Sequence, residues 1–135
     1  MARVKDWYLE LHGEMEAASA RSFVWGIHDC CLHAARCIDA MTGSALEGKL
    51  HTLYHDERSA LELITRHGGL AGAIDAILGL PRIPIALVKR GDLALVDHID
   101  IEAVGIVMGN GVVCVRQEGL MCSERSRILI VWGIR

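Results

Sequence analysis

The residues best suited to chemistry lie in one short stretch, Phe23 to Cys31, which reads Phe-Val-Trp-Gly-Ile-His-Asp-Cys-Cys. Gly26 favours a turn, and Cys30 follows in the first turn of a predicted helix. There, unpaired backbone N–H groups and the positive end of the helix dipole favour a thiolate over a thiol. Cys30 is therefore a candidate nucleophile. The alternative is that Cys30 is a small apolar residue at a crowded helix start.

A metal centre is the other chemistry that these residue types allow. Cys30, His33 and Cys37 share one helical stripe. A fourth zinc ligand would come from Cys114 or Cys122, later in the chain. However, the sequence has no Cys-x-x-Cys knuckle, and the same stripe carries the apolar residues of an ordinary core face. We therefore expect neither a metal nor a cofactor.

Hydrophobic periodicity predicts the helices that must position these residues, all within the first 80 positions. The expected helices run from Asp6 to Ala20, from Asp29 to Thr42, from Asp56 to about Gly68 and from about Leu70 to Leu78. Gly43 is the residue type that ends a helix in the left-handed conformation, and Asp56 is a suitable N-cap. Cys30 thus lies at the start of the second predicted helix.

After Pro84, β-branched residues and turn signals predict strands instead. The expected strands are Ile85–Val88, Leu93–Val96, Val104–Met108, Val112–Val115 and Ile128–Trp132. Asn110-Gly111 is a strong hairpin signal, because both central residues of such a turn need positive φ. Helices followed by strands predict an α+β fold in which helices cover one face of an antiparallel sheet. We expect a single domain over residues 1–135, helical over about 1–80 and sheet over about 83–135.

Composition limits the classes of protein that these 135 residues can form. The chain is 52% hydrophobic with 2 prolines, which excludes a disordered chain, and its net charge of -3 offers no basic surface for nucleic acid. No apolar stretch has the roughly 18 residues of a membrane span, and acidic residues interrupt the N-terminus where a signal peptide needs an apolar core. Five cysteines, an odd number with one adjacent pair, favour free thiols and folding in the cytoplasm.

Three short motifs occur in order along the chain: Trp25-Gly26 followed by Asp29-Cys30, then Gly91-Asp92-Leu93, then Val104 to Gly111. Together they resemble the motifs of the NlpC-type cysteine peptidases. The resemblance implies a papain-like fold and cleavage of bacterial peptidoglycan stem peptides. It also implies that Cys30 is the nucleophile, that Asp29 orients or caps it, and that Gly91-Asp92 begins the central sheet.

A wider set of features includes the Trp-Gly and Asp-Cys pairs, Gly91-Asp92, Thr42-Gly43, Glu118-Gly119-Leu120 and a late Trp132. In these features the chain is similar to small phage proteins related to that family. Such proteins resemble the tail-tip component encoded beside the hub genes of long-tailed phages. This resemblance implies a location in the virion tail after assembly in the host cytoplasm. It implies tail hub and tail-tip proteins as partners, with peptidoglycan as a further partner.

One position departs from the peptidase pattern. Active members of the family carry a histidine immediately before the Val-Gly-Ile strand, whereas this chain has Ala103. A cysteine peptidase needs that imidazole to hold the thiolate and to protonate the leaving amine. His98 lies five residues earlier and is the candidate replacement base. His28 and His33 are near Cys30 in sequence but are more typical of capping or exposure and of packing, respectively.

Two functions remain open on the sequence. The first, which Ala103 favours, is a structural tail component that keeps the peptidase scaffold without catalysis. The second is an active cysteine peptidase with Cys30 as nucleophile, Asp29 orienting or capping it, and His98 as base.

Overall fold

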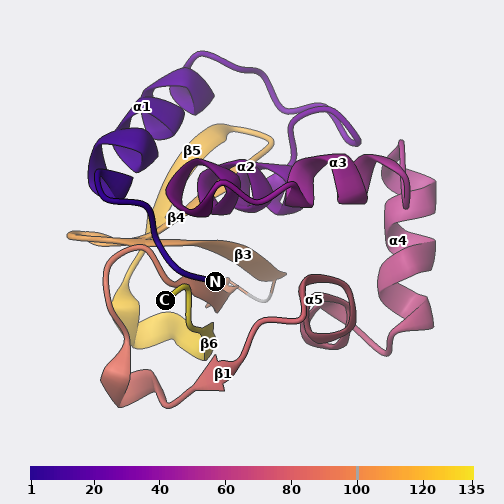
Figure 1. The fold of residues 1–135 in the computed structure, drawn as a ribbon. Coiled ribbons are helices and arrows are strands. Elements are labelled where there is room, and N and C mark those ends of the chain that lie inside the picture. The colour runs from indigo at the N-terminus through magenta and orange to yellow at the C-terminus, as the bar shows by residue number, and fades with distance from the viewer. Residues whose placement is uncertain (100) are drawn as a thin grey trace.

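The computed structural model describes residues 1–99 and 101–135, with helices in the first part of the chain and strands in the second (Figure 1). The helices are α1 (Trp7–Ser19), α2 (Cys30–Thr42), α3 (Leu46–His51), α4 (Glu57–Arg66) and α5 (Leu70–Leu78). The strands are β1 (Arg82–Ile83), β2 (Leu93–His98), β3 (Ile101–Met108), β4 (Gly111–Arg116), β5 (Gly119–Ser123) and β6 (Ile128–Trp132). The α+β prediction is confirmed. Of the helices described, none is long and apolar enough to cross a membrane.

The six strands form one antiparallel sheet in the order β1-β6-β2-β3-β4-β5. At its centre, β2 pairs with β3 along the whole of β2, from Leu93↔Ile106 to His98↔Ile101. By contrast, β3 pairs with β4 over a short stretch that ends at Ile106↔Val113. The first half of β3 therefore has β2 on one side and no paired β4 on the other.

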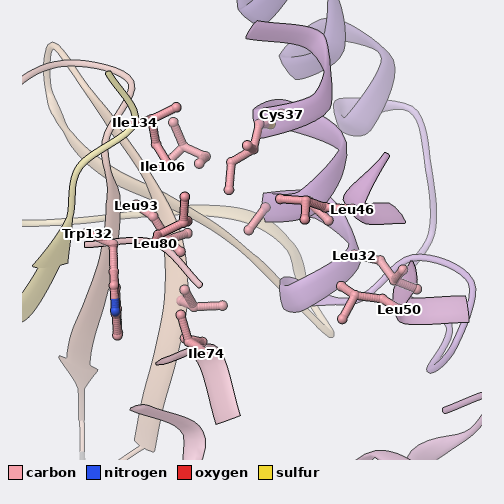
Figure 2. Close-up of a cluster of buried hydrophobic side chains, with 14 of the residues drawn as sticks. Leu32, Cys37, Leu46, Leu50, Ile74, Leu80, Leu93, Ile106, Trp132 and Ile134 are labelled. Atoms are coloured by element: carbon pink, nitrogen blue, oxygen red, sulfur yellow. The ribbon is translucent and has the colours of Figure 1, made fainter. Parts of the chain in front are cut away.

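The main hydrophobic core lies between the helices and one face of the sheet. Figure 2 shows its helical side chains, including Leu32 and Cys37 of α2, across from the sheet residues Leu93 and Ile106. Because side chains alternate along a strand, the opposite face of the sheet needs its own apolar cover. A second, smaller cluster supplies it, formed by Ala94, Val96, Ala103, Val107, Val112, Cys114, Ile128 and Val131.

The predicted strand at Ile85–Val88 is wrong. The chain there forms a 3₁₀ turn, η1 (Ile85–Leu87), just after the short edge strand β1. Pro84 precedes the turn and has no N–H to donate to a ladder. Ile85, Ala86 and Leu87 are all exposed, so this segment has no buried face. The β-branched composition that predicted a strand therefore had no sheet face on which to pack.

The hairpin between β3 and β4 is present, but its turn lies one residue earlier than predicted. Met108 pairs with Gly111, so the turn residues are Gly109 and Asn110, and neither is among the described residues with positive φ. Gly111 is instead needed for packing, because a Cβ there would lie 2.3 Å from the carbonyl oxygen of Ser123 on β5. The glycine that signalled a turn therefore allows close approach of two strands.

Helix α3 and strand β5 also lie where no element was predicted. Helix α3 is a short helix of 6 residues, and such helices carry little periodicity to detect. Strand β5 has no strict alternation of buried and exposed residues, but it pairs with β4 from Arg116↔Gly119 to Val112↔Ser123. Both depend on neighbours for their stability, so local sequence carried a weak signal for them.

Asp92 ties both ends of the chain to the sheet. Its carboxylate is fully buried and lies 3.2 Å from Nη2 of Arg3 and 2.7 Å from Nη2 of Arg135. It also accepts hydrogen bonds from the backbone N–H groups of Lys89 at 2.8 Å and Ile134 at 3.1 Å. The N- and C-termini lie close together as a result (Figure 1).

Candidate functional site

Helix α2 begins at Cys30 because Asp29 caps it. Asp29 has extended backbone, and its Oδ1 accepts a hydrogen bond from the N–H of Leu32 at 2.9 Å. The helix ends as predicted, with Gly43 in the left-handed conformation at φ 73°. Cys30 is thus the first residue of α2, at the end where the helix dipole is positive.

A tight turn brings the chain to this helix start. Val24 and His28 form an isolated antiparallel bridge, in which the N–H of His28 donates to the carbonyl of Val24 at 2.8 Å. Between them, Gly26 has φ 81° and donates its N–H to Oδ2 of Asp29 at 3.0 Å. A Cβ at Gly26 would lie 2.1 Å from the carbonyl oxygen of His55. Glycine is therefore required here both by conformation and by space.

Tyr54, which follows α3, binds the Asp29 carboxylate from the other side. Its hydroxyl lies 2.8 Å from Oδ1 and 2.9 Å from Oδ2 of Asp29, and both side chains are buried. Among the described residues, the donors to Asp29 are this hydroxyl and two backbone N–H groups. Of the two roles expected for Asp29, orienting and capping, Asp29 has the capping role, and it positions the start of α2.

The Cys30 thiol is half-buried and has a lowered pKa. Its Sγ lies 4.0 Å from Sγ of Cys31, and the hydrogen bond from Cys31 is the largest cause that lowers the pKa of Cys30. Burial and the Asp29 carboxylate raise this pKa, and the Val104 backbone N–H and the Arg116 guanidinium add smaller decreases. The same bond raises the pKa of Cys31 well above its usual value. Cys30 is thus the better thiolate of the pair.

The open end of the β3–β4 ladder explains how Cys30 meets a backbone N–H. Val107 donates its N–H toward β2, to the carbonyl of Asp92 at 2.9 Å. Because backbone groups alternate in direction along a strand, the N–H of Val104 points to the opposite side of β3. Pairing with β4 ends at Ile106, so this N–H is not used in the ladder there. It contributes instead to lowering the pKa of Cys30.

Ala103 lies beside Val104 and carries no ionisable group. It is 1% exposed and belongs to the second apolar cluster. Cys114 packs in the same cluster, and burial raises the pKa of its thiol to about 12. An imidazole at position 103 would have to displace closely packed apolar neighbours. The position at which the family resemblance expects a base is therefore filled by packing.

His98, the candidate replacement base, has another partner. It ends β2, and its Nδ1 lies 3.0 Å from Oγ of Ser123, which is buried at the end of β5. In the part of the chain that the structure describes, no hydrogen bond joins His98 to Cys30. The fold therefore does not bring these two predicted site residues together.

The two histidines nearest Cys30 in sequence are both buried. The exposure or capping expected for His28 is wrong, because it is 2% exposed and Arg36 lies over it, with Nη1 3.0 Å from Nδ1. Burial, helped by Arg36, lowers the pKa of His28. The packing role expected for His33 is confirmed, since its ring nitrogens lie 3.8 and 3.9 Å from Sγ of Cys37 and burial lowers its pKa to about 3. Neither ring hydrogen-bonds to Cys30 within residues 1–99 and 101–135.

The candidate zinc ligands are dispersed in the structure. His33 and Cys37 contact each other inside the helical part, and Cys30 is bonded to neither in the described chain. Cys114 is buried in β4, whereas Cys122 is exposed on β5. Over the residues described, no group of three or more Cys, His, Asp or Glu side chains is arranged to hold a metal ion.

The roles of three groups at the site were not predicted from the sequence. Tyr54 reaches Asp29 across 25 positions, and only tertiary packing makes it a partner. The N–H of Val104 faces Cys30 because β4 leaves the ladder before this residue. Cys31 was visible in the sequence, but its hydrogen bond to Cys30 depends on the rotamers that the surroundings impose.

Comparison with protein families assigns nearly the whole chain to one family. The family model that matches is described as a domain of unknown function, DUF6950, and the match covers residues 2–134. No curated protein matches the chain. The match extends over the helices, the sheet and the Cys30 site alike. The chain therefore belongs to the DUF6950 family.

Proposed function

We propose that this protein is a structural component of a phage tail tip, built on a papain-like NlpC-type scaffold that no longer catalyses peptide cleavage. The α+β order, with a cysteine at the start of a helix facing an antiparallel sheet, supports the scaffold. The resemblance of the Trp-Gly, Asp-Cys and Gly-Asp motifs to small tail-tip proteins supports the location.

One observation carries the loss of catalysis. The groups that lower the pKa of Cys30 are a thiol, a backbone N–H and a guanidinium, and none of them is an imidazole. Attack on an amide needs a group that takes the thiol proton and later gives one to the leaving amine. Ala103 packs in the apolar cluster on the sheet face away from the helices, and His98 is bonded to Ser123.

Exposed apolar side chains at one end of the sheet support docking on tail hub proteins. Ile99 is 70% exposed, Ile101 is 51% exposed and Leu129 is 48% exposed. Val96 of β2 pairs with Ile128 of β6, so the β2–β3 hairpin tip and the start of β6 lie at the same end of the sheet. Clustered apolar side chains on a surface are typical of protein interfaces.

The decisive experiment is quantitative mass spectrometry of purified virions. A structural component is present in fixed copy number relative to the tail hub protein. Its absence from complete virions would overturn the proposal.

Surface variants then test the docking end. Leu129→Asp should lower incorporation into particles by at least tenfold, because it buries a charge in an apolar interface. Leu61→Asp is the matched control, since Leu61 is 49% exposed on helix α4 rather than on the sheet. Equal incorporation of the two variants would contradict docking through this end.

The second candidate function is an active cysteine peptidase cleaving peptidoglycan stem peptides, and the lowered pKa of Cys30 favours it. The test incubates purified protein with peptidoglycan and separates the released stem peptides by chromatography. The structural function predicts no release and normal particle assembly of Cys30→Ala. Release that is lost in Cys30→Ala but kept in Cys31→Ala would establish the peptidase instead.

A further inference from the structure

Cys30 and Cys31 form a pair of thiols at the start of α2. Their Sγ atoms lie 4.0 Å apart, and among the described residues no other two thiols share a hydrogen bond. Both residues are half-buried and keep surface open to solvent, whereas Cys37 and Cys114 are buried. The pair therefore combines close approach of two sulfur atoms with access for a small solute.

Cys30 is the member of the pair that reacts first with an oxidant, because the thiolate is the form that attacks a peroxide. Its position at the start of a helix favours the thiolate, and the hydrogen bond from Cys31 is the largest cause that lowers its pKa. The Val104 N–H and the Arg116 guanidinium act in the same direction. The pKa of Cys31 is raised well above its usual value, so Cys31 stays protonated beside the Cys30 thiolate.

Oxidation of Cys30 makes its neighbour reactive. The largest cause that raises the pKa of Cys31 is its hydrogen bond to Cys30. That bond holds the Cys31 proton because its acceptor is a thiolate. A sulfenic acid at Cys30 carries no such charge, so Cys31 then gives up its proton more readily. Its Sγ already lies 4.0 Å from the Cys30 sulfur, which is the atom of a sulfenic acid that a second thiol attacks.

We propose that the Cys30–Cys31 pair is a site of reversible oxidation by hydroperoxides, with Cys30 as the reacting thiol and Cys31 as the resolving thiol. With hydrogen peroxide, the Cys30 thiolate attacks one oxygen, an S–O bond forms, and the O–O bond breaks to release hydroxide. The Cys31 thiolate then attacks the Cys30 sulfur, so that an S–S bond forms and the S–O bond breaks to release a second hydroxide. Each hydroxide takes the proton of one thiol and becomes water. The two thiols lose two electrons and the peroxide gains them. This site goes beyond the proposed tail function and needs no peptidase activity.

The disulfide couples oxidation to the start of α2. Adjacent Cα atoms are about 3.8 Å apart, whereas disulfide-bonded residues usually have Cα atoms about 4.4 Å apart or more. A bridge between Cys30 and Cys31 therefore strains the helical backbone. It loosens the first turn, including the hydrogen bond from the Leu32 N–H to Asp29 that caps the helix. Strained disulfides are reduced easily, so a thiol reductant restores the pair.

The test treats the full chain with hydrogen peroxide at neutral pH and then alkylates the remaining thiols with N-ethylmaleimide in denaturant. Trypsin places both cysteines in one peptide, from Ser22 to Arg36, which mass spectrometry follows. That peptide should lose two hydrogen atoms, take up no maleimide and regain both thiols with dithiothreitol. Cys122, exposed on β5, should remain free and become alkylated. Full alkylation of the pair, a sulfinic acid at Cys30 in place of the bridge, or a bridge from Cys30 to another cysteine would overturn the proposal.

Matched variants separate the roles of the two thiols. Cys31→Ala has no resolving thiol, so peroxide should leave a sulfenic acid at Cys30 that dimedone traps. Cys30→Ala lacks the reacting thiol and should leave Cys31 free for maleimide. Cys122→Ala is the control and should form the bridge as the wild type does. Failure of dimedone to label a folded Cys31→Ala protein would contradict the role of Cys30, and the wild-type peptide decides the proposal if a variant does not fold.

Stability measures the coupling of the bridge to α2. The oxidised wild type should unfold at a lower urea concentration than the reduced protein, and dithiothreitol should restore the midpoint. Peroxide should leave the midpoint of Cys31→Ala unchanged, because that variant cannot form the bridge. Equal midpoints for the oxidised and reduced wild type would contradict the loosening of the helix start.

Discussion

Two buried aspartates, Asp29 and Asp92, hold the helical and the sheet parts of the molecule in different ways. Asp29 receives hydrogen bonds from neutral donors, the backbone N–H groups of Gly26 and Leu32 and the hydroxyl of Tyr54. Two of these three donors lie within three residues of it. Asp29 thus determines a local feature, the turn and the start of α2.

Asp92 binds charged partners from the two ends of the chain. Arg3 lies 89 positions before it and Arg135 lies 43 positions after it. Removal of Asp92 therefore leaves two cations facing a buried site, whereas removal of Asp29 leaves neutral donors unpaired. Both residues belong to motifs that carry the family resemblance, and each has a structural role in the fold. Asp29 binds neutral donors, whereas Asp92 binds cations from both ends of the chain.

Among the substitutions, the largest expected effect is that of Asp92→Ala. It should lower the free energy of unfolding by roughly 3 kcal/mol, because it leaves Arg3 and Arg135 without their carboxylate. Urea denaturation measures this loss. Glu62→Ala is the control, since it breaks the exposed Arg58–Glu62 pair and should leave stability near that of the wild type. Similar losses in both variants would show that the Asp92 cluster is only a surface interaction.

The next effect is that of Asp29→Ala, which we expect to cost roughly 2 to 3 kcal/mol. The substitution removes the N-cap of α2 and leaves the hydroxyl of Tyr54 buried without an acceptor. The same denaturation experiment applies. Asp29→Asn keeps one carbonyl oxygen as acceptor and should recover part of the lost stability. If Asp29→Asn were as unstable as Asp29→Ala, capping would not be the main contribution of Asp29.

Acid should destabilise the helical part through His33. Its pKa is about 3 in the folded protein and 6.5 in the unfolded chain, so the unfolded state binds the proton first. The contribution of neutral His33 to the free energy of unfolding is therefore fully present above pH 6.5. It falls by about 1.4 kcal/mol per pH unit toward pH 3. Unfolding at a series of pH values measures the slope. His33→Gln should flatten it, whereas His12→Gln, at an exposed position, should not.

A smaller effect is expected for Tyr54→Phe, about 1 kcal/mol. Burial raises the pKa of Tyr54, so its hydroxyl remains a donor to Asp29 at all ordinary pH values. Loss of that donor leaves Asp29 its two backbone N–H groups. Double-mutant analysis with Asp29→Ala isolates the pair, and strictly additive losses would contradict direct coupling.

The smallest effect concerns salt. Screening lengths fall from about 10 Å at 0.1 M salt to about 3 Å at 1 M, and the Arg135 side chain is 37% exposed. The cost of Asp92→Ala should therefore shrink in 1 M NaCl by a few tenths of a kcal/mol, while that of Asp29→Ala stays constant because its donors are neutral. Equal salt dependence of the two variants would contradict the difference in charge between the partners of Asp29 and those of Asp92.

Local pattern predicted much of the fold. Helix α2 was expected from Asp29 to Thr42 and runs from Cys30 to Thr42, since cap, periodicity and Gly43 all act within a few residues. The strand predicted at Ile85–Val88 failed because a β-branched composition does not say whether a sheet edge is available. Strand β5 escaped prediction for the converse reason, as its pairing with β4 stabilises it.

The sequence by itself determined the α+β order, the start of α2 directly after its N-cap Asp29 and the placement of Cys30 at a positive helix end. Those features depend on interactions between residues close together in the chain. Tertiary structure alone decided that His98 meets Ser123 and that Cys30 meets the N–H of Val104. These contacts follow from the order in which strands join the sheet and from the point where β3 and β4 part, and both are set by packing among distant segments.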